Sequence, residues 1–216
     1  MRLSQDQFDT ALKRGSLRLA LIGMSNIGKS FRARQLQDEK RFELFVVDRE
    51  IEKRLGISGI EAVARWMGPP YAPAYARAEE RYLALEAEVI GGICPKKGNL
   101  VVDSTGSIIY LPAPILEDLK KRFLIVHLAI DKSMIGPMTD RFFAHPKPCI
   151  WKGMFRKEPK ESPEVALRRS YPEWLKFRHT KYKELADVSI SGLYSMSPEI
   201  TCAQFLKAIR EALPTK

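Results

Sequence analysis

The amino-acid sequence predicts an α/β fold, in which a parallel β-sheet carries helices on both faces. Short apolar segments alternate along the 216-residue chain with segments of helical spacing, which is the order found in such folds. The apolar segments do not alternate strictly between polar and apolar residues, as expected for strands that are buried on both faces. A phosphate-binding motif follows the first of them. The length predicts one domain over residues 1–216.

Five segments rich in Val, Ile, Leu and Phe are the predicted strands: 18–22, 43–47, 100–102, 123–128 and 187–191. Helical spacing and helix-start residues predict the first six helices. These are Gln5–Lys13 (within an N-terminal helical region, residues 1–16), Lys29–Gln37, Arg49–Leu55, Ile60–Trp66, Pro73–Ile90 and Pro114–Lys121.

Two further helices are predicted toward the C-terminus. Ser162 and Pro163 form a helix start, with serine as the cap and proline in the first turn. Pro172 is expected to break or restart this helix, which Glu173–Leu185 continue. A last helix begins at Ser197-Pro198 and ends near Leu213.

The phosphate-binding motif is GMSNIGKS, which matches the pattern G-x-x-x-x-G-K-[ST] between a strand and a helix. Its glycines allow a tight turn in which N–H groups point at phosphate oxygens, and the start of the helix adds a positive field. Lys29 is expected to reach the outer phosphates, and the Ser30 hydroxyl is expected to bind Mg²⁺. The predicted nucleotide contacts are Gly23, Met24, Ser25, Asn26, Ile27, Gly28, Lys29, Ser30 and Phe31.

Acidic residues follow two other predicted strands, at the sheet edge where such folds bind ligands. Asp103 is expected to hold Mg²⁺, although Asp before Ser-Thr-Gly is also a common turn residue. Of Asp48 and Glu50, one is expected to assist the metal and the other to accept a proton from an attacking hydroxyl. Asp48 is alternatively a helix cap. Thr105 and Gly106 are expected at the floor of the acceptor pocket.

Composition argues against membrane, disulfide and zinc-binding proteins. The chain starts without an apolar leader, and no apolar run approaches the ~18 residues that cross a bilayer. The three cysteines lie far apart and have no metal-ligand spacing. We therefore expect reduced thiols, a cytoplasmic location and no membrane partner. The oligomeric state is left open.

The net charge of +10 is concentrated in Arg141–Lys183, which holds twelve lysines and arginines against four glutamates. Such a segment neutralises nucleotide phosphates, attracts nucleic acid, or forms a solvated surface. Residues 140–161 have no clear period, and we interpret them as a lid whose cations close over the phosphates. The aromatic residues of the basic segment favour a small core over a base-stacking platform. Arg178 presents a planar fork that suits a carboxylate or a phosphate.

Taken together, these features resemble the shikimate kinases, which are small P-loop kinases. The phosphate loop and FRHTKYKELADVSI (177–190) are the specific motifs. FVVDREIEKRLG (45–56), YLALEAEVI (82–90) and VVDSTGS (101–107) match at the level of pattern, and the resemblance covers about residues 17–210. It implies strand order 2-3-1-4-5, a lid after the fourth strand, ATP and Mg²⁺ as cofactors, and phosphoryl transfer to a hydroxyl of a small anionic metabolite.

By position, the resemblance implies that Asp48 supports magnesium, Glu50 contacts the acceptor hydroxyl, Arg178 grips the acceptor carboxylate and Arg141 packs on adenine. The sequence also departs from the family. Leu83 stands where a second carboxylate-binding arginine is expected, Thr105-Gly106-Ser107 replaces a triple glycine, glutamate replaces aspartate at position 50, and residues 145–148 replace the lid arginine.

These departures predict an acceptor other than shikimate, because each charge-assisted hydrogen bond contributes ~1.5–3 kcal/mol. Two alternative functions stay open at this point. The basic, aromatic segment is also consistent with a polynucleotide kinase or a nucleic-acid-associated NTPase. The phosphate loop alone is consistent with a non-catalytic ATP-binding protein.

Overall fold

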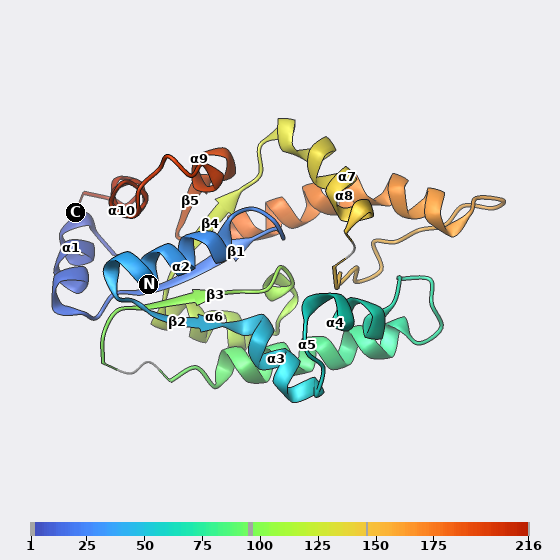
Figure 1. Cartoon of the computed structure of the whole chain (residues 1–216), viewed down its shortest axis with the longest axis horizontal. Helices are drawn as coiled ribbons and strands as arrows, with labels where there is room; N and C mark the ends of the chain where they lie inside the picture. Colours follow the sequence, from blue (N-terminus) through green and yellow to red (C-terminus); the bar gives the residue numbers. More distant parts are fainter. Residues whose placement is uncertain (1–2, 95–96, 146, 216) are drawn as a thin grey trace.

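The computed structural model of the chain describes residues 3–94, 97–145 and 147–215. Its centre is a five-stranded sheet in the order β2-β3-β1-β4-β5 (Figure 1), and each pair of neighbouring strands is parallel. The predicted fold class and strand order are therefore confirmed. The strands are Arg18–Gly23 (β1), Glu43–Val46 (β2), Leu100–Asp103 (β3), Leu124–Ala129 (β4) and Val188–Ser191 (β5).

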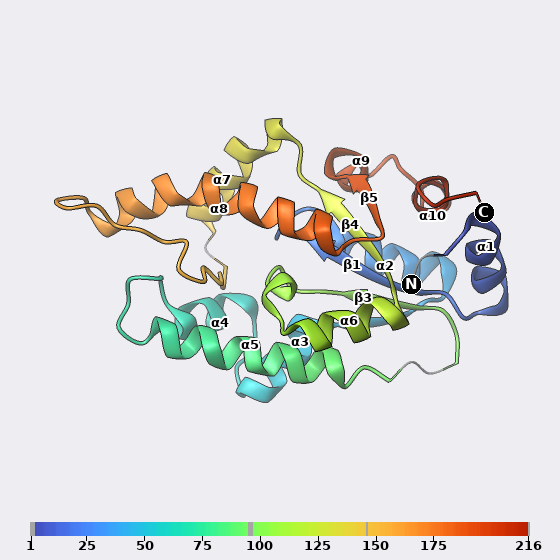
Figure 2. The ribbon, with the colours of Figure 1, turned by 180° about the vertical axis from the view of Figure 1, so that it is seen from behind.

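Helices cover both faces of the sheet. α2 and α10 contact one face, and α1 packs against α10. α8 contacts the other face, where α6 also lies with α5 packed along it (Figure 2). The helices are Gln5–Arg14 (α1), Lys29–Lys40 (α2), Val47–Leu55 (α3), Ile60–Met67 (α4), Tyr75–Gly91 (α5), Ala113–Arg122 (α6), Ile135–Ala144 (α7), Pro163–Leu185 (α8), Gly192–Met196 (α9) and Cys202–Glu211 (α10), with 3₁₀ turns at Ile108–Tyr110 (η1) and Lys132–Met134 (η2). Within the residues described, no helix is long and apolar enough to cross a membrane.

The register of the sheet brings three chain segments together at its carboxyl edge. Asp103 of β3 pairs with Leu21 of β1 and with Val46 of β2. The phosphate loop after β1, the start of α3 after β2 and the loop after β3 therefore begin next to one another. α4 and α5 on one side, and α7 and α8 on the other, extend beyond this edge (Figure 1).

Several element boundaries differ from the sequence prediction. α3 begins at Val47, so Asp48 lies in the first helical turn and not at a strand end. α8 runs unbroken through Pro172, which costs one helical hydrogen bond; the buried face that continues on both sides of the proline holds the helix together. The predicted last helix is α10 alone and begins later, at Cys202, because Thr201 is its N-cap. The short helix α9 lies before the predicted start and was not predicted. The sequence pattern does not predict α7.

The predicted lid, residues 140–161, is fixed at several points. It begins inside α7, and Pro146 lies outside the described residues. Farther on, the Trp151 side chain is buried and stacks on Trp174 of α8, with ring centroids 5.1 Å apart. The aromatic residues of this region therefore form the small core predicted from the sequence. The opening and closing of a lid stays a prediction.

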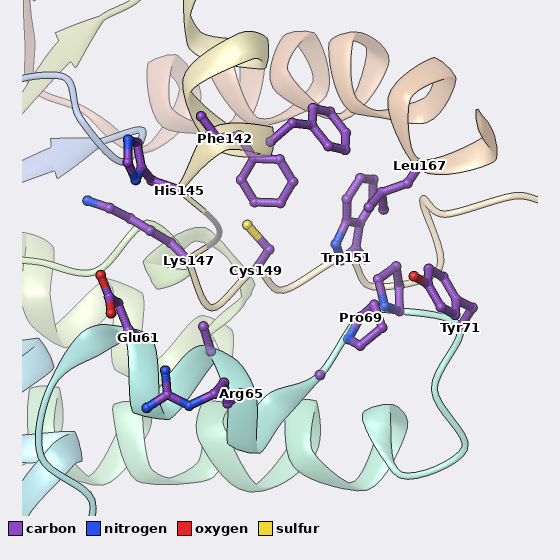
Figure 3. Close-up of a pocket in the computed structure, with 15 residues that line it drawn as sticks. Glu61, Arg65, Pro69, Tyr71, Phe142, His145, Lys147, Cys149, Trp151 and Leu167 are labelled. Atoms are coloured by element: carbon purple, nitrogen blue, oxygen red, sulfur yellow. The ribbon is translucent and has the colours of Figure 1, made fainter. Parts of the chain in front are cut away.

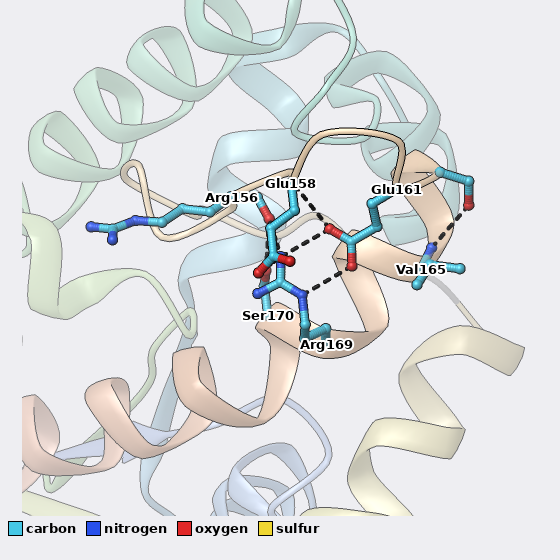
Figure 4. A network of polar contacts seen from close by, with 7 residues as sticks. Arg156, Glu158, Glu161, Val165, Arg169 and Ser170 are labelled. Atoms are coloured by element: carbon cyan, nitrogen blue, oxygen red, sulfur yellow. Dashed lines mark hydrogen bonds and ion pairs between the residues drawn. The ribbon is translucent and has the colours of Figure 1, made fainter.

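A polar network holds the turn between this segment and α8 (Figure 4). Arg169 donates to both carboxylate oxygens of Glu161, at 2.9 Å each, and to the Arg156 carbonyl oxygen at 2.9 Å. The Ser162 hydroxyl accepts a hydrogen bond from the Val165 N–H at 3.3 Å, which confirms the predicted helix start.

Candidate active site

The phosphate loop, residues 23–30, needs glycine at two positions. Gly23 and Gly28 have φ angles of 140° and 96°, which residues with a side chain rarely adopt. A Cβ atom at Gly23 would lie 2.7 Å from the Leu128 carbonyl oxygen. Because α2 begins at Lys29, its positive N-terminal end faces the loop. This geometry fits an anion-binding turn.

Two pockets meet at the phosphate loop. The outer pocket has a volume of about 360 Å³ and is lined by Asn26, Gly28, Lys29, Ser30, Phe31, Arg141, Lys147 and Met196. The inner pocket has a volume of about 80 Å³ and lies at the carboxyl edge of the sheet. Its lining includes Ser25, Asn26, Lys29, Ser30, Asp48, Tyr82, Asp103, Thr105, Gly106, Ser107, Lys147 and Arg178.

Four predicted site residues lie outside the linings of both pockets. Met24 and Ile27 point into the core, and Gly23 contributes a carbonyl oxygen to Lys29. The Glu50 carboxylate pairs with Lys53 Nζ at 2.6 Å. Residues two apart on a helix point about 200° apart. The turn that directs Asp48 into the inner pocket therefore directs Glu50 away from it.

Lys29 is buried beside the phosphate loop, and its ammonium group donates to the carbonyl oxygens of Gly23 and Met24 at 2.9 Å each. Burial lowers the pKa of Lys29 to about 8, and the nearby carboxylates of Asp103 and Asp48 partly oppose this effect. A polyphosphate beside this ammonium would favour its charged form. Lys29 thus lies where the motif requires a cation.

Two carboxylates of the inner pocket suit a hydrated cation. Asp103 is buried, and its Oδ1 atom has no hydrogen-bond partner, which leaves an unsatisfied acceptor. Asp48 Oδ1 accepts a hydrogen bond from the Tyr82 hydroxyl at 3.0 Å, and burial raises the pKa of Asp48. Oxygen donors are the ligands that Mg²⁺ prefers. Ser30 completes the set, and these residues therefore fit Mg²⁺ at this position.

Arg178 is a buried cation at the wall of the inner pocket. Its side chain is 3% exposed, and its guanidinium carbon lies 4.3 Å from the centroid of the Trp174 ring. The Nε atom and one Nη atom have no hydrogen-bond partner. A Cβ atom at Gly106 would lie 3.0 Å from Arg178 Nη2, so glycine permits this close approach. Unpartnered N–H groups on a buried guanidinium favour an anionic ligand.

Glu86 is a site residue that the sequence analysis missed. It is fully buried on α5, and its carboxylate accepts hydrogen bonds from the Thr105 and Ser107 hydroxyls. Both hydroxyl groups belong to the loop after β3, so Glu86 fixes the floor of the inner pocket. An acidic residue on the apolar face of the predicted helix 73–90 is the signal that identifies it.

Glu86→Gln is expected to change how stability depends on pH. Burial raises the pKa of Glu86 from 4.5 to about 7. At pH values between these two, the folded protein keeps a proton on Glu86 that the unfolded chain has already released. The free energy of unfolding therefore falls as pH rises through this range. The loss is at most about 3–4 kcal/mol, at ~1.4 kcal/mol for each pKa unit.

Urea unfolding at several pH values between these limits measures the effect. Glu86→Gln should be less sensitive to pH than the wild type, and Glu88→Gln, on the exposed face of the same helix, should behave as the wild type does. Equal pH dependence in Glu86→Gln and the wild type would contradict this account.

Two further cations shape the outer pocket. Lys147 Nζ donates to the Asn26 side-chain oxygen at 2.7 Å, so the segment after α7 reaches the phosphate loop. Arg32 is fully buried on α2 and donates to the carbonyl oxygens of Ser195 and Ser197 at 2.7 Å each. It therefore holds the turn that carries Met196 against the outer pocket. A charged residue on the buried face of a predicted helix is again the sequence signal that identifies Arg32.

Comparison with known proteins finds similarity to shikimate kinases. A shikimate kinase from Pseudoalteromonas atlantica (strain T6c / ATCC BAA-1087) is 30% identical over 169 residues, which cover 77% of this chain and 82% of that relative. No family model matches the sequence.

Solved structures share the fold at lower identity. The shikimate kinase from Acinetobacter baumannii in complex with shikimate superimposes with a TM-score of 0.61 at 20% identity, with 94% of each chain covered. The shikimate kinase from Bacteroides thetaiotaomicron has a TM-score of 0.62 at 14% identity, and the match covers 90% of this chain and 97% of the other.

Proposed function

Since this chain belongs to the shikimate kinase family and is an ATP-dependent kinase that acts on a small metabolite, we propose that its acceptor is a small anionic molecule other than shikimate. One observation carries the proposal. Arg178 presents unpartnered N–H groups, next to Gly106, at the wall of the inner pocket. An anionic group of the acceptor would satisfy them.

The proposal that the acceptor is not shikimate rests on the number of cations that the inner pocket offers to an acceptor. Among the described residues that line the inner pocket, Arg178 is the one arginine, and Lys29 and Lys147 lie on the side of the phosphate loop. Leu83, at the position where the family resemblance implies a second arginine, is a buried apolar residue. Shikimate would therefore keep one of two arginine contacts, at a cost of ~1.5–3 kcal/mol for each charge-assisted hydrogen bond lost.

The proposed reaction uses the residues of both pockets. The loop amides and Lys29 hold the nucleotide phosphates, and Arg141 lines the outer pocket and not the inner one. Ser30 and Asp103 would hold Mg²⁺, which neutralises phosphate charge when bound. Asp48 accepts the hydroxyl proton while the acceptor oxygen bonds to the γ-phosphorus. The bond from that phosphorus to the β–γ bridging oxygen breaks, and ADP leaves with its electron pair.

Asp48→Asn is expected to lower kcat by about 10²–10⁴-fold, the range for losing a general base. Glu50→Gln is the matched control on the same helix, and kcat should change by less than about threefold because Glu50 pairs with Lys53. Steady-state ADP release measures both. If Glu50→Gln were as damaging as Asp48→Asn, the proton acceptor would have to be reassigned.

Leu83→Arg is expected to increase kcat/KM for shikimate by about tenfold or more, which corresponds to one restored charge-assisted contact. The introduced arginine stands three residues before Glu86 on α5, one helical turn from the carboxylate that holds the floor of the inner pocket. The KM for ATP should not change. No gain with shikimate would contradict the proposed arrangement of the acceptor pocket.

Shikimate itself tests the proposed function. With saturating ATP and Mg²⁺, the wild type should show a kcat/KM for shikimate below ~10⁴ M⁻¹s⁻¹, the lower end for enzymes acting on their own substrates. A value at or above this limit would identify shikimate as the acceptor and overturn the proposal.

A further inference from the structure

A third pocket lies beside the active site and takes no part in the proposed reaction (Figure 3). Its volume is about 620 Å³, within the range of about 300–1,000 Å³ typical of small-molecule sites. It is bounded by α4 and the turn at residues 68–71 on one side, and by the end of α7 and residues 147–151 on the other. We refer to it as the aromatic pocket.

One extended segment separates the aromatic pocket from the inner pocket. Along residues 147–151, Cys149 and Trp151 line the aromatic pocket, whereas Pro148 and Ile150 line the inner pocket. Lys147 lines both. Successive side chains of extended backbone point to opposite sides, so this segment forms a wall with one pocket on each side.

Hydrogen bonds hold this wall in place. The Trp151 N–H donates to Glu79 Oε1 at 2.8 Å, and the Cys149 carbonyl oxygen accepts from the Tyr75 hydroxyl at 2.6 Å. From the other side, Trp174 Nε1 donates to the Ile150 carbonyl oxygen at 3.0 Å. α5 and α8 thus fix the wall between them, and the two pockets are separate sites.

The aromatic pocket has a polar end and an apolar end. Arg65, His145 and Lys147 lie toward one end with Glu61, and Tyr71, Trp151 and Leu167 lie toward the other (Figure 3). In the part of the chain that the structure describes, neither Glu61 nor Arg65 forms an ion pair. At the polar end, Arg65 is therefore available to an anionic group, while the Lys147 ammonium is held by Asn26 of the phosphate loop. The opposite end offers ring faces and aliphatic surface.

We propose that the aromatic pocket is a second ligand site, separate from the acceptor pocket, for a planar aromatic molecule that carries an anionic group. The anionic group would lie beside Arg65, and the ring would lie among the aromatic side chains. This site goes beyond the proposed kinase reaction, because none of the residues assigned to phosphoryl transfer other than Lys147 lines it.

Calorimetric titration with 2-naphthoate tests the proposal, and 2-naphthamide serves as the uncharged counterpart. The wild type should bind the carboxylate about tenfold or more tightly than the amide. Arg65→Ala should weaken binding of 2-naphthoate by a similar factor and keep acceptor-dependent ADP release. Arg54→Ala, an exposed arginine outside the pocket, should bind as the wild type does. Ala64→Trp should fill the pocket and remove binding, with thermal melting as the check on folding.

Arg178→Gln separates this site from the acceptor pocket, because Arg178 lines the inner pocket and not the aromatic pocket. This variant should bind 2-naphthoate normally. Loss of binding in Arg178→Gln would place the ligand in the acceptor pocket and overturn the proposal. Equal affinity for the acid and the amide, or equal affinity in Arg65→Ala and Arg54→Ala, would also overturn it. None of these measurements depends on the identity of the phosphate acceptor, so their failure is distinct from failure of the proposed function.

Discussion

Lys29→Ala is expected to abolish ATP turnover and to leave the fold intact. The ammonium group lies at the phosphate loop, 2.9 Å from each of the two carbonyl oxygens that accept its hydrogen bonds. No other cation on α2 is placed to stabilise the charge that develops on the transferred phosphoryl group. Loss of one electrostatic stabiliser of a transition state costs about 10²–10³-fold in kcat. Loss of phosphate binding adds to this. ADP release with saturating acceptor measures the effect.

The control for Lys29→Ala is Lys53→Ala, a largely exposed lysine that pairs with Glu50. It should retain turnover within about threefold, because exposed ion pairs contribute about 0–1 kcal/mol. Thermal melting should show that both variants are folded. Unchanged turnover in a folded Lys29→Ala protein would contradict the assignment of the phosphate loop.

Arg178→Gln is expected to raise the KM for the acceptor by about 100-fold or more and to leave the KM for ATP nearly unchanged. Two charge-assisted hydrogen bonds at ~1.5–3 kcal/mol each account for a loss of this size. The change should not destabilise the fold strongly, because Arg178 forms no ion pair with any carboxylate among the described residues. Initial rates at varied acceptor and varied ATP separate the two KM values.

Lys181→Gln is the matched control, since Lys181 lies on the exposed face of the same helix and pairs with Glu184. Both KM values should stay near those of the wild type. An Arg178→Gln enzyme with an unchanged acceptor KM would contradict the proposed role of the guanidinium group.

The fold could be predicted from the sequence because its main signals are local. Apolar strands, the phosphate-binding motif and helix-start residues are each readable within a few residues, and they gave the sheet and most helices. The exceptions depend on tertiary contacts. Pro172 does not break α8, because buried side chains such as Tyr171 and Trp174 flank it. α7 has no strong local signal and lies against α8.

The site was predictable where one motif defines it and less so where separate elements meet. The phosphate loop, Asp103 and Arg178 lie together at the sheet edge, as their positions at strand ends and on a basic helix indicate. Glu50 was assigned from its place after the second strand and from the family resemblance, and the helical turn at α3 directs it to Lys53. Glu86 and Arg32 escaped notice because single charged residues on apolar helix faces become informative only once their partners are known. Binding of nucleic acid by the basic segment stays a prediction.

Acceptor-dependent release of ADP across paired compounds tests the central claim most directly. Each pair would combine a small hydroxylated carboxylate or phosphate ester with its neutral amide or dephosphorylated counterpart, at fixed ATP and Mg²⁺. We expect turnover with at least one anionic member, none with its neutral counterpart, and loss of that preference in Arg178→Gln. Equal turnover with charged and neutral members of each pair would contradict the account.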